Sequence, residues 1–345
     1  MTTERRSLTQ RLDEYQRRHR WAGFPLAVIY KFFDDQGPFL AALLTYYGFL
    51  SLFPSLLLLT TILGFVLQHD PLLQTRILDS ALGQFPLIGN DLPRGHLNGS
   101  NWAVVVGLLG ILYGGLGVAQ AGQNAMNVVW AVPRNRRPNP LKSRGKSLLL
   151  LATVGLGVVA TTALSGLVNA TEAFGATIGL GVTVPAFLIS VTLNSGIFLV
   201  AFRVATVRDV AWREIAPGAI GAAVFWQFLQ LAGTSYVQHT LRTTSATYGT
   251  FGLVLGLLGF IYLEALAVVF AAETNAVLAR RLWPRALLTP FTDNVELTAA
   301  DEHAYASYAE AQRLKGFETI EVSFRDRPAR RRPRRRSTRA RRTRR

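Results

Sequence analysis

Apolar residues in this chain gather in six long blocks separated by polar connectors, without the short period of a surface helix or strand. Each block holds about 17 or more mainly apolar residues, enough at about 1.5 Å per residue to cross a hydrocarbon core about 30 Å thick. We therefore predict an all-α fold, a polytopic membrane helix bundle with six transmembrane helices. The blocks are Phe39–Gln68, Trp102–Gln123, Ser147–Ala170, Ile178–Phe202, Ile215–Leu231 and Thr250–Val277.

Positive charge is shared unequally between the two sides of such a bundle. Of the 37 lysines and arginines, 34 lie in the N-terminal segment, the second and fourth connectors and the C-terminal segment. The other three connectors hold the remaining three. Because basic residues concentrate in cytoplasmic connectors of membrane proteins, this distribution predicts that both termini are cytoplasmic.

The chain divides into four predicted regions. Residues 1–38 form a cytoplasmic amphipathic segment, 39–280 the transmembrane domain, 281–324 a cytoplasmic segment with one short helix, and 325–345 a disordered tail. The short helix is expected over Leu297–Lys315, with Thr298 as its N-cap.

The N-terminal segment has aromatic and apolar residues near helical spacing, interspersed with basic residues. This pattern predicts an interfacial helix on the cytoplasmic membrane surface. The alternative is a polar tail that enters the membrane directly. The residues concerned are Trp21, Phe24, Val28, Phe32 and Phe33.

The last 21 residues hold 13 arginines and one acid, and account for most of the net charge of +16. We expect this tail to bind anionic lipid headgroups, because the membrane is tethered beside it. Nucleic acid is the alternative anionic partner. The tail has no aromatic residue to stack on bases, so we expect no specific nucleic-acid binding.

Polar residues inside or directly beside the blocks are the main functional candidates. They all lie in the cytoplasmic half of their helices, which predicts a polar cavity open to the cytoplasm. Glu264 is the only ionisable residue deep in a block, and such residues often mark a pathway. The alternative is that these groups only form hydrogen bonds between helices. The candidates are Tyr46, Tyr47, Gln120, Gln123, Asn124, Asn127, Asn194 and Glu264.

Glycines recur at spacings of three and four in the second and sixth blocks, so each set lies on one helical face. Small residues let two helices approach closely, and we predict packing contacts there, with a sliding surface as the alternative. The glycines are Gly107, Gly110, Gly114 and Gly117, and Gly252, Gly256 and Gly259.

Glu273 and Asn275 lie near the cytoplasmic end of the sixth block. We expect Glu273 to form an ion pair with an arginine of the fourth connector, Arg203, Arg208 or Arg213. The basic residues from Arg134 to Lys146 are explained by topology, with contact to a substrate phosphate as the alternative.

The sequence shows no catalytic constellation. It has no cysteine, and its five histidines are scattered without metal-ligand spacing. Phosphate-binding and nucleophile-elbow motifs are also missing from it. We therefore predict no metal, no cofactor and no enzymatic activity.

Four strings resemble the YihY/BrkB family of bacterial inner-membrane proteins, at matching spacing over about residues 20–285. They are FFDDQGPFLAALLTYYGFLSLFPSLLLL (Phe32–Leu59), FPLIGNDL (Phe85–Leu92), QNAMNVVWAVPRNRRP (Gln123–Pro138) and YGTFGLVLGLLGFIYLEALAVVFAAETNA (Tyr248–Ala276).

The resemblance implies a six-span protein of the bacterial cytoplasmic membrane. It favours a transporter or exporter of a lipid-like or amphiphilic envelope solute. The alternative is a non-transporting membrane scaffold for envelope machinery, and the oligomeric state stays open. Members of the family are often labelled ribonuclease BN, but this sequence lacks the clustered His and Asp ligands that a zinc-dependent nuclease needs.

Overall fold

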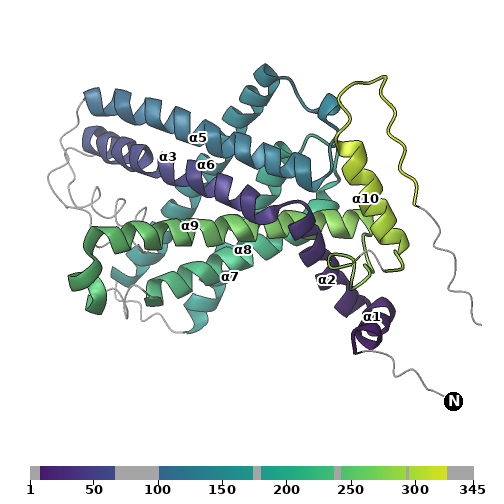
Figure 1. The fold of residues 1–345 in the computed structure, drawn as a ribbon. Coiled ribbons are helices and arrows are strands. Elements are labelled where there is room, and N and C mark those ends of the chain that lie inside the picture. Colours follow the sequence, from purple (N-terminus) through teal and green to yellow (C-terminus); the bar gives the residue numbers. More distant parts are fainter. Residues whose placement is uncertain (1–7, 67–100, 174–179, 237–241, 293–294, 325–345) are drawn as a thin grey trace, which may run out of the picture.

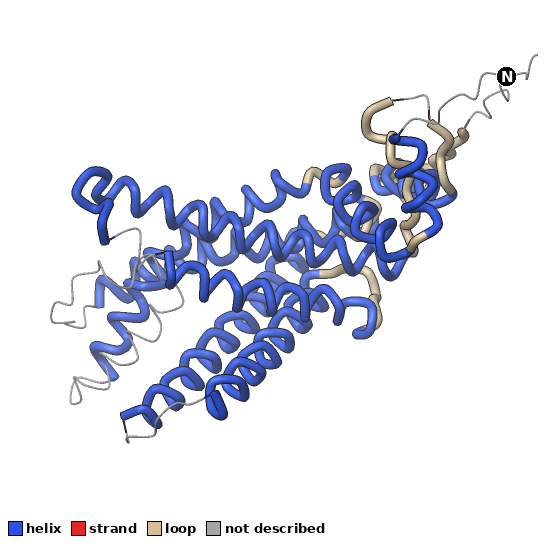
Figure 2. Tube along the Cα trace, turned by 90° about the horizontal axis from the view of Figure 1, so that it is seen from below, coloured by secondary structure: helices blue, strands red, loops and turns tan. Residues whose placement is uncertain are grey.

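The computed structural model describes residues 8–66, 101–173, 180–236, 242–292 and 295–324, and their regular structure is helical throughout (Figure 2). This agrees with the predicted all-α class. The FPLIGNDL string and the Arg-rich tail lie outside the described residues. The helices are α1 (Leu8–Arg18), α2 (Arg20–Asp34), α3 (Gly37–Val66), α5 (Asn101–Val129), α6 (Pro140–Ala173), α7 (Leu180–Ala205), α8 (Trp212–Tyr236), α9 (Arg242–Arg280) and α10 (Ala299–Ala311).

Six long helices form a closed ring. Each packs on the next in the order α3, α5, α6, α7, α8 and α9, and α9 packs on α3 (Figure 1). Five of them, α3, α5, α7, α8 and α9, are long and apolar enough to cross a membrane. The sixth, α6, has 34 residues, carries Lys142, Arg144 and Lys146 in its first two turns, and is not among the five found in the described part of the chain. The chain is thus a membrane protein with several apolar helices.

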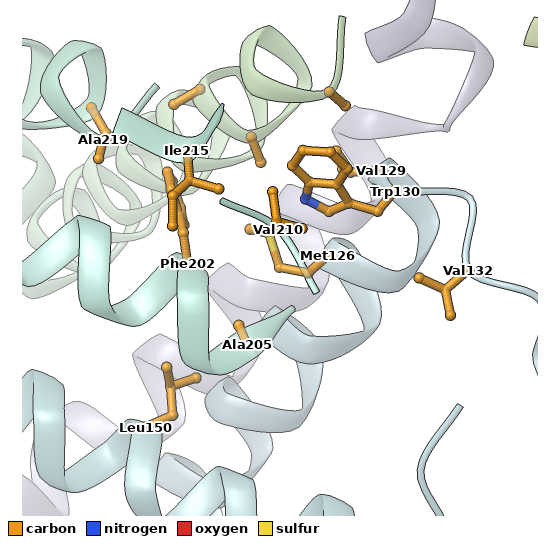
Figure 3. Packing of buried hydrophobic residues seen from close by; sticks show 14 of the residues in the cluster. Met126, Val129, Trp130, Val132, Leu150, Phe202, Ala205, Val210, Ile215 and Ala219 are labelled. Atoms are coloured by element: carbon orange, nitrogen blue, oxygen red, sulfur yellow. The ribbon is translucent and has the colours of Figure 1, made fainter. Parts of the chain in front are cut away.

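The largest apolar cluster lies where α5, α7, α8 and α9 come together (Figure 3). Trp130 and Met126 from the end of α5 pack with Phe202 of α7 and with Ile215 of α8. Val210, from the connector between α7 and α8, is also part of this cluster. The connector is therefore held against the helices rather than left as a free loop.

Several polar segments gather at this same end of the ring. The backbone N–H of Asn135, between α5 and α6, donates to the carbonyl of Arg313 beyond α10 at 3.1 Å. Figure 1 shows α1, α2 and α10 at this end as well. We call it the connector end, comprising α1, α2, the connectors 130–139 and 206–211, and residues 281–324.

The N-terminal segment differs from the predicted single interfacial helix. It forms two helices, and α2 packs against protein: Val28 lies in a cluster with Val277 and Leu282, and Phe24 meets Trp283 edge-on. Trp21 and Phe33 remain exposed. The apolar face of α2 is therefore divided, since one part is covered by α9 and the following segment.

The predicted N-cap of the C-terminal helix is confirmed. The Thr298 hydroxyl accepts the backbone N–H of Asp301, and the Asp301 carboxylate accepts the backbone N–H of Thr298. This reciprocal capping box satisfies donors that the first turn of α10 would otherwise leave free. The helix itself is shorter than predicted and ends at Ala311.

Candidate functional site

A buried ion cluster joins α2 to α9 at the connector end. The ammonium group of Lys31 lies 3.0 Å from a carboxylate oxygen of Glu273 and also pairs with Asp35. Lys31 and Glu273 are fully shielded from solvent, and Asp35 is buried. The other oxygen of Glu273 has no hydrogen-bond partner among the described residues. The cluster therefore contains two carboxylates for one cation.

Charge balance controls protonation in this cluster. Burial opposes the charge on Lys31, but Glu273 and Asp35 outweigh it and raise the pKa of the lysine. Burial also raises the pKa of Asp35, against the opposing effect of Lys31. Lys31 is thus held charged, as expected for a buried cation between two anions.

A second buried network fixes the segment that follows α9. Arg285 is almost fully buried and pairs with Asp301 of α10 and, at 3.1 Å, with Asp34 of α2. Asp301 also accepts the backbone N–H of Ala286 at 3.0 Å. From α1, Asp13 accepts the N–H of Leu287 at 2.8 Å. Residues from both ends of the chain are therefore joined in one unit.

Asn275 joins α9 to α8. Its side chain accepts the backbone N–H of Gly218 at 2.7 Å and donates to the carbonyl of Ile215 at 3.0 Å. A Cβ at Gly218 would lie 2.2 Å from the carbonyl oxygen of Ala271, so only glycine permits this approach. Pro217 lies in the same turn of α8 and has no N–H to donate. The Asn275 amide thus binds the backbone of α8 on both sides of this proline.

The predicted cavity residues differ in how far their side chains are buried. Glu264 shares a face of α9 with Ala271 and Asn275, the face that meets α8. One of its carboxylate oxygens has no accessible surface and no hydrogen-bond partner in the described part of the chain. Asn127 is buried, and its side-chain oxygen has no hydrogen-bond partner among the residues that the structure describes. On α7, Asn194 shares a face with Phe198, which packs on the main cluster.

Gln123 instead forms hydrogen bonds with a neighbouring helix. Its amide nitrogen donates to the Ser147 hydroxyl at 2.8 Å and to the Ser143 carbonyl at 3.2 Å. Its amide oxygen accepts the Ser143 hydroxyl at 3.2 Å. These bonds connect α5 to α6, so Gln123 fits the alternative of interhelix hydrogen bonding.

Three candidates have exposed side chains, whereas Glu264 and Asn127 are partly or fully buried. Tyr46 is 58% exposed and shares a face of α3 with the exposed Phe39 and Phe53. Gln120 and Asn124 are exposed on a common face of α5. The reason is geometric, because the polar arc on α5 crosses the boundary between the covered and uncovered sides of the helix.

Tyr47 lies instead at the contact of α3 with α5, where its ring would meet a Cβ at Gly117. Further along the same contact, Gly110 lies against Pro54 and Gly114 against the backbone of Ser51. Gly107 is buried. The two helices thus approach closely along the glycines of α5.

The glycines of α9 differ from those of α5. Gly259 is exposed, and a Cβ there would meet nothing within 4 Å. Gly252 and Gly256 are partly buried. The predicted packing stripe therefore does not extend to Gly259, because that position lies on an uncovered face of α9.

The expected partner of Glu273 was wrong. The carboxylate pairs with Lys31 of α2 and with none of the three connector arginines. Arg203 pairs with Asp209 at 2.6 Å, within its own connector, and lies over the ring of Trp212. Sequence reasoning missed Lys31, because it was counted only as one basic residue on an amphipathic helix.

The other residues that sequence reasoning missed are Asp34, Asp35, Arg285 and Asp301. The only signal for the first two was their place in the FFDD string, directly before the first apolar block. Arg285 and Asp301 gave none, since isolated charges in a polar segment are usually solvated.

The family described as virulence factor BrkB matches residues 28–292. The matched range includes Lys31, Glu273 and Arg285, and all six helices of the ring. No solved structure gives a significant match to the chain.

Among similar proteins, ribonuclease-like protein YfkH of Bacillus subtilis is 24% identical over 272 residues, which cover 71% of this chain and 91% of that protein. A UPF0761 membrane protein of Nitrosospira multiformis is 30% identical over 157 residues, or 45% of this chain and 36% of that protein. A UPF0761 membrane protein of Ralstonia nicotianae is 28% identical over 176 residues, or 50% and 38%. The matches thus span little more than a third of the two UPF0761 proteins.

Proposed function

This chain belongs to the virulence factor BrkB family of membrane proteins, and on that premise we propose that it carries a lipid-like or amphiphilic envelope solute across the bacterial cytoplasmic membrane. The observation that carries this proposal is the carboxylate of Glu264. It lies within a helix of the ring, on the face toward α8, and one oxygen lacks any partner in the described residues. An ionisable group at such depth is costly, and it commonly marks a pathway for solutes or protons.

Glu264 can act in two ways along such a pathway. Its carboxylate can accept hydrogen bonds from a hydroxyl or ammonium group of a passing solute, or it can take up a proton. Asn127 and Asn194 offer further polar groups on the α5 and α7 helices of the same ring. The exposed Tyr46, Gln120 and Asn124 are not part of this proposed path.

The proposed topology has six spans with both termini in the cytoplasm, α6 being the third span. Its support is that the basic connectors 130–139 and 206–211 lie at the same end as the N-terminal helices and residues 281–324. Reporter fusions after Gly95 and after Arg285 should report opposite sides of the membrane. Finding both reporters on one side would refute this topology.

Transport is tested in vesicles that contain the purified protein and a phospholipid with a fluorescent acyl chain. An impermeant reductant bleaches the outer leaflet, and a translocating protein exposes the inner pool to it. We expect protein-dependent bleaching of that pool for the wild type and for Glu302→Gln, an exposed control on α10. Glu264→Gln should lose it while inserting normally. Bleaching equal to that of protein-free vesicles would reject transport of this lipid class.

A scaffold is the second candidate function, and the two buried ion networks favour it. They hold α1, α2 and residues 281–311 as one unit on α9, which gives a fixed cytoplasmic surface for partners. In either function we propose that the Arg-rich tail contacts anionic headgroups.

A nuclease is not part of the proposal. The ribonuclease-like name belongs to the Bacillus subtilis relative. In the part of this chain that the structure describes, no three His, Asp or Glu residues lie together as a metal-binding group.

A further inference from the structure

Two arginines without acidic partners meet at the connector end. Arg208 lies in the connector between α7 and α8, and Arg280 is the last residue of α9. Ala279, next to Arg280, packs on the apolar cluster that contains Trp130, and the charge of Arg208 acts on Arg280. The guanidinium of Arg208 also lies over the ring of the buried Trp130, 6.0 Å from its centre. The tertiary structure thus concentrates positive charge at one place.

Arg280 is the more unusual of the two. Its Nη1 has no accessible surface and no hydrogen-bond partner among the described residues. A cation at the end of a helix interacts favourably with the helix dipole, but that does not satisfy a buried N–H group. Asp35, the carboxylate whose charge acts on Arg280, is already paired with Lys31. A hydrogen-bond acceptor is therefore missing beside Arg280.

Four other arginines at this end form ion pairs with acids, whereas Arg208 and Arg280 form none among the described residues. One nitrogen each of Arg17, Arg285 and Arg313 also lacks a hydrogen-bond partner in this part of the chain, but only Arg280 combines such a nitrogen with the absence of an acid partner. The ion pairs are Arg17 with Asp13, Arg203 with Asp209, Arg285 with Asp34 and Asp301, and Arg313 with Glu310.

His303 on α10 lies within the influence of the same charge. Burial and the charge of Arg280 lower the pKa of this histidine, so its ring stays neutral at physiological pH. A neutral imidazole can still donate one N–H to an anion. His303 thus adds a possible donor beside Arg280.

We propose that Arg208 and Arg280 form a binding site for a phosphate group, carried by a lipid headgroup or by a free phosphate. Guanidinium groups bind phosphate oxygens through paired, charge-assisted hydrogen bonds. Bound phosphate relieves the repulsion between the arginines and supplies the acceptor that the buried Nη1 lacks. The exposed side chain of Arg208 leaves the site open on one side.

The site would identify a phosphate as the charged group of the carried solute. Its role in the cell therefore rests on the proposed transport function. Binding is nevertheless measured without transport. A protein that binds phosphate but moves no lipid keeps the site and rejects the transporter, so the two failures can be distinguished.

The experiment follows the melting temperature of the full chain in a neutral maltoside detergent. Three probes are titrated: dihexanoyl phosphatidylglycerol, inorganic phosphate, and dihexanoylglycerol, which lacks the phosphate. Variants are Arg280→Gln and Arg208→Gln, with Arg18→Gln as control. Arg18 is exposed on α1, so its loss removes the same charge from the connector end away from the site.

We expect stabilisation by the phosphate-bearing lipid in the wild type and in the control. Affinity should fall roughly ten-fold or more in each site variant, the effect of losing one charge-assisted hydrogen bond. Equal stabilisation by inorganic phosphate identifies a free phosphate as a sufficient ligand, and its absence identifies the lipid headgroup. Equal binding of dihexanoylglycerol, unchanged affinity in both site variants, or an equal loss in Arg18→Gln would overturn the site.

Discussion

Replacing Lys31 by methionine should destabilise the protein strongly, because it leaves two buried carboxylates without their cation. Lys31 has no exposed surface, and both its partners are buried. Two unit charges about 4 Å apart interact by about 4 kcal/mol at an effective dielectric constant of about 20. Removing one partner of a buried ion pair costs about 3–5 kcal/mol in proteins generally. We expect Lys31→Met to lower the free energy of unfolding by that amount.

Removing one carboxylate from the cluster, by contrast, should be well tolerated. Glu273→Gln leaves one lysine with one carboxylate, Asp35, and removes a charge whose second oxygen has no partner among the described residues. We expect a change in stability within about 1 kcal/mol, since neutralising an excess buried charge offsets the loss of one ion pair. We therefore expect Lys31→Met to lose much more stability than Glu273→Gln.

Lowering the pH should restore part of the stability that Lys31→Met loses. In the wild type, Lys31 opposes the effect of burial on the pKa of Asp35, so its removal raises that pKa further. A carboxyl group whose folded pKa exceeds its unfolded value binds more protons when folded. Stability therefore rises as the pH falls from the folded pKa toward the unfolded value. The deficit of the variant should shrink on acidification.

Thermal unfolding in detergent, followed by tryptophan fluorescence at several pH values, measures these differences. Lys142→Met is the control, because it removes an exposed lysine from the first turn of α6 and should change stability by less than about 0.5 kcal/mol. If Lys31→Met proves as stable as this control, or Glu273→Gln the less stable of the two cluster variants, the charge argument fails.

Three further results are expected. Gly218→Ala should destabilise the protein by roughly 1–3 kcal/mol, because its Cβ would lie 2.2 Å from a carbonyl oxygen of α9. Gly221→Ala, whose Cβ would meet nothing within 4 Å, should not destabilise it in the same melting assay. Gly114→Ala should likewise lower the melting temperature relative to Gly259→Ala, and equal values would contradict the close approach of α3 and α5. Deleting residues 325–345 should leave membrane insertion unchanged but reduce binding to anionic vesicles, and equal binding to neutral ones would refute lipid recognition.

The positions of the long helices could be read from the sequence. Each of the six apolar blocks overlaps one of the six helices of the ring, and the described helix ends differ from the block ends by up to eight residues. A membrane-spanning helix satisfies its own backbone hydrogen bonds, and its length is set by the bilayer. Whether such a helix forms is therefore decided by the residues of that segment alone. The N-cap of α10 at Thr298 is local for the same reason, since the bonds that make it join residues three apart.

Only the tertiary structure decided which face of each helix is covered and which charges meet. Asn124 and Asn127 are three residues apart, yet the first is exposed and the second buried, because neighbours cover only part of α5. Glu273 pairs with Lys31 rather than with an arginine of the nearer connector. Any of several cations could have matched its charge, and the packing of α2 on α9 brought this one within reach. A sequence lists the charges, but long-range packing chooses the pairs.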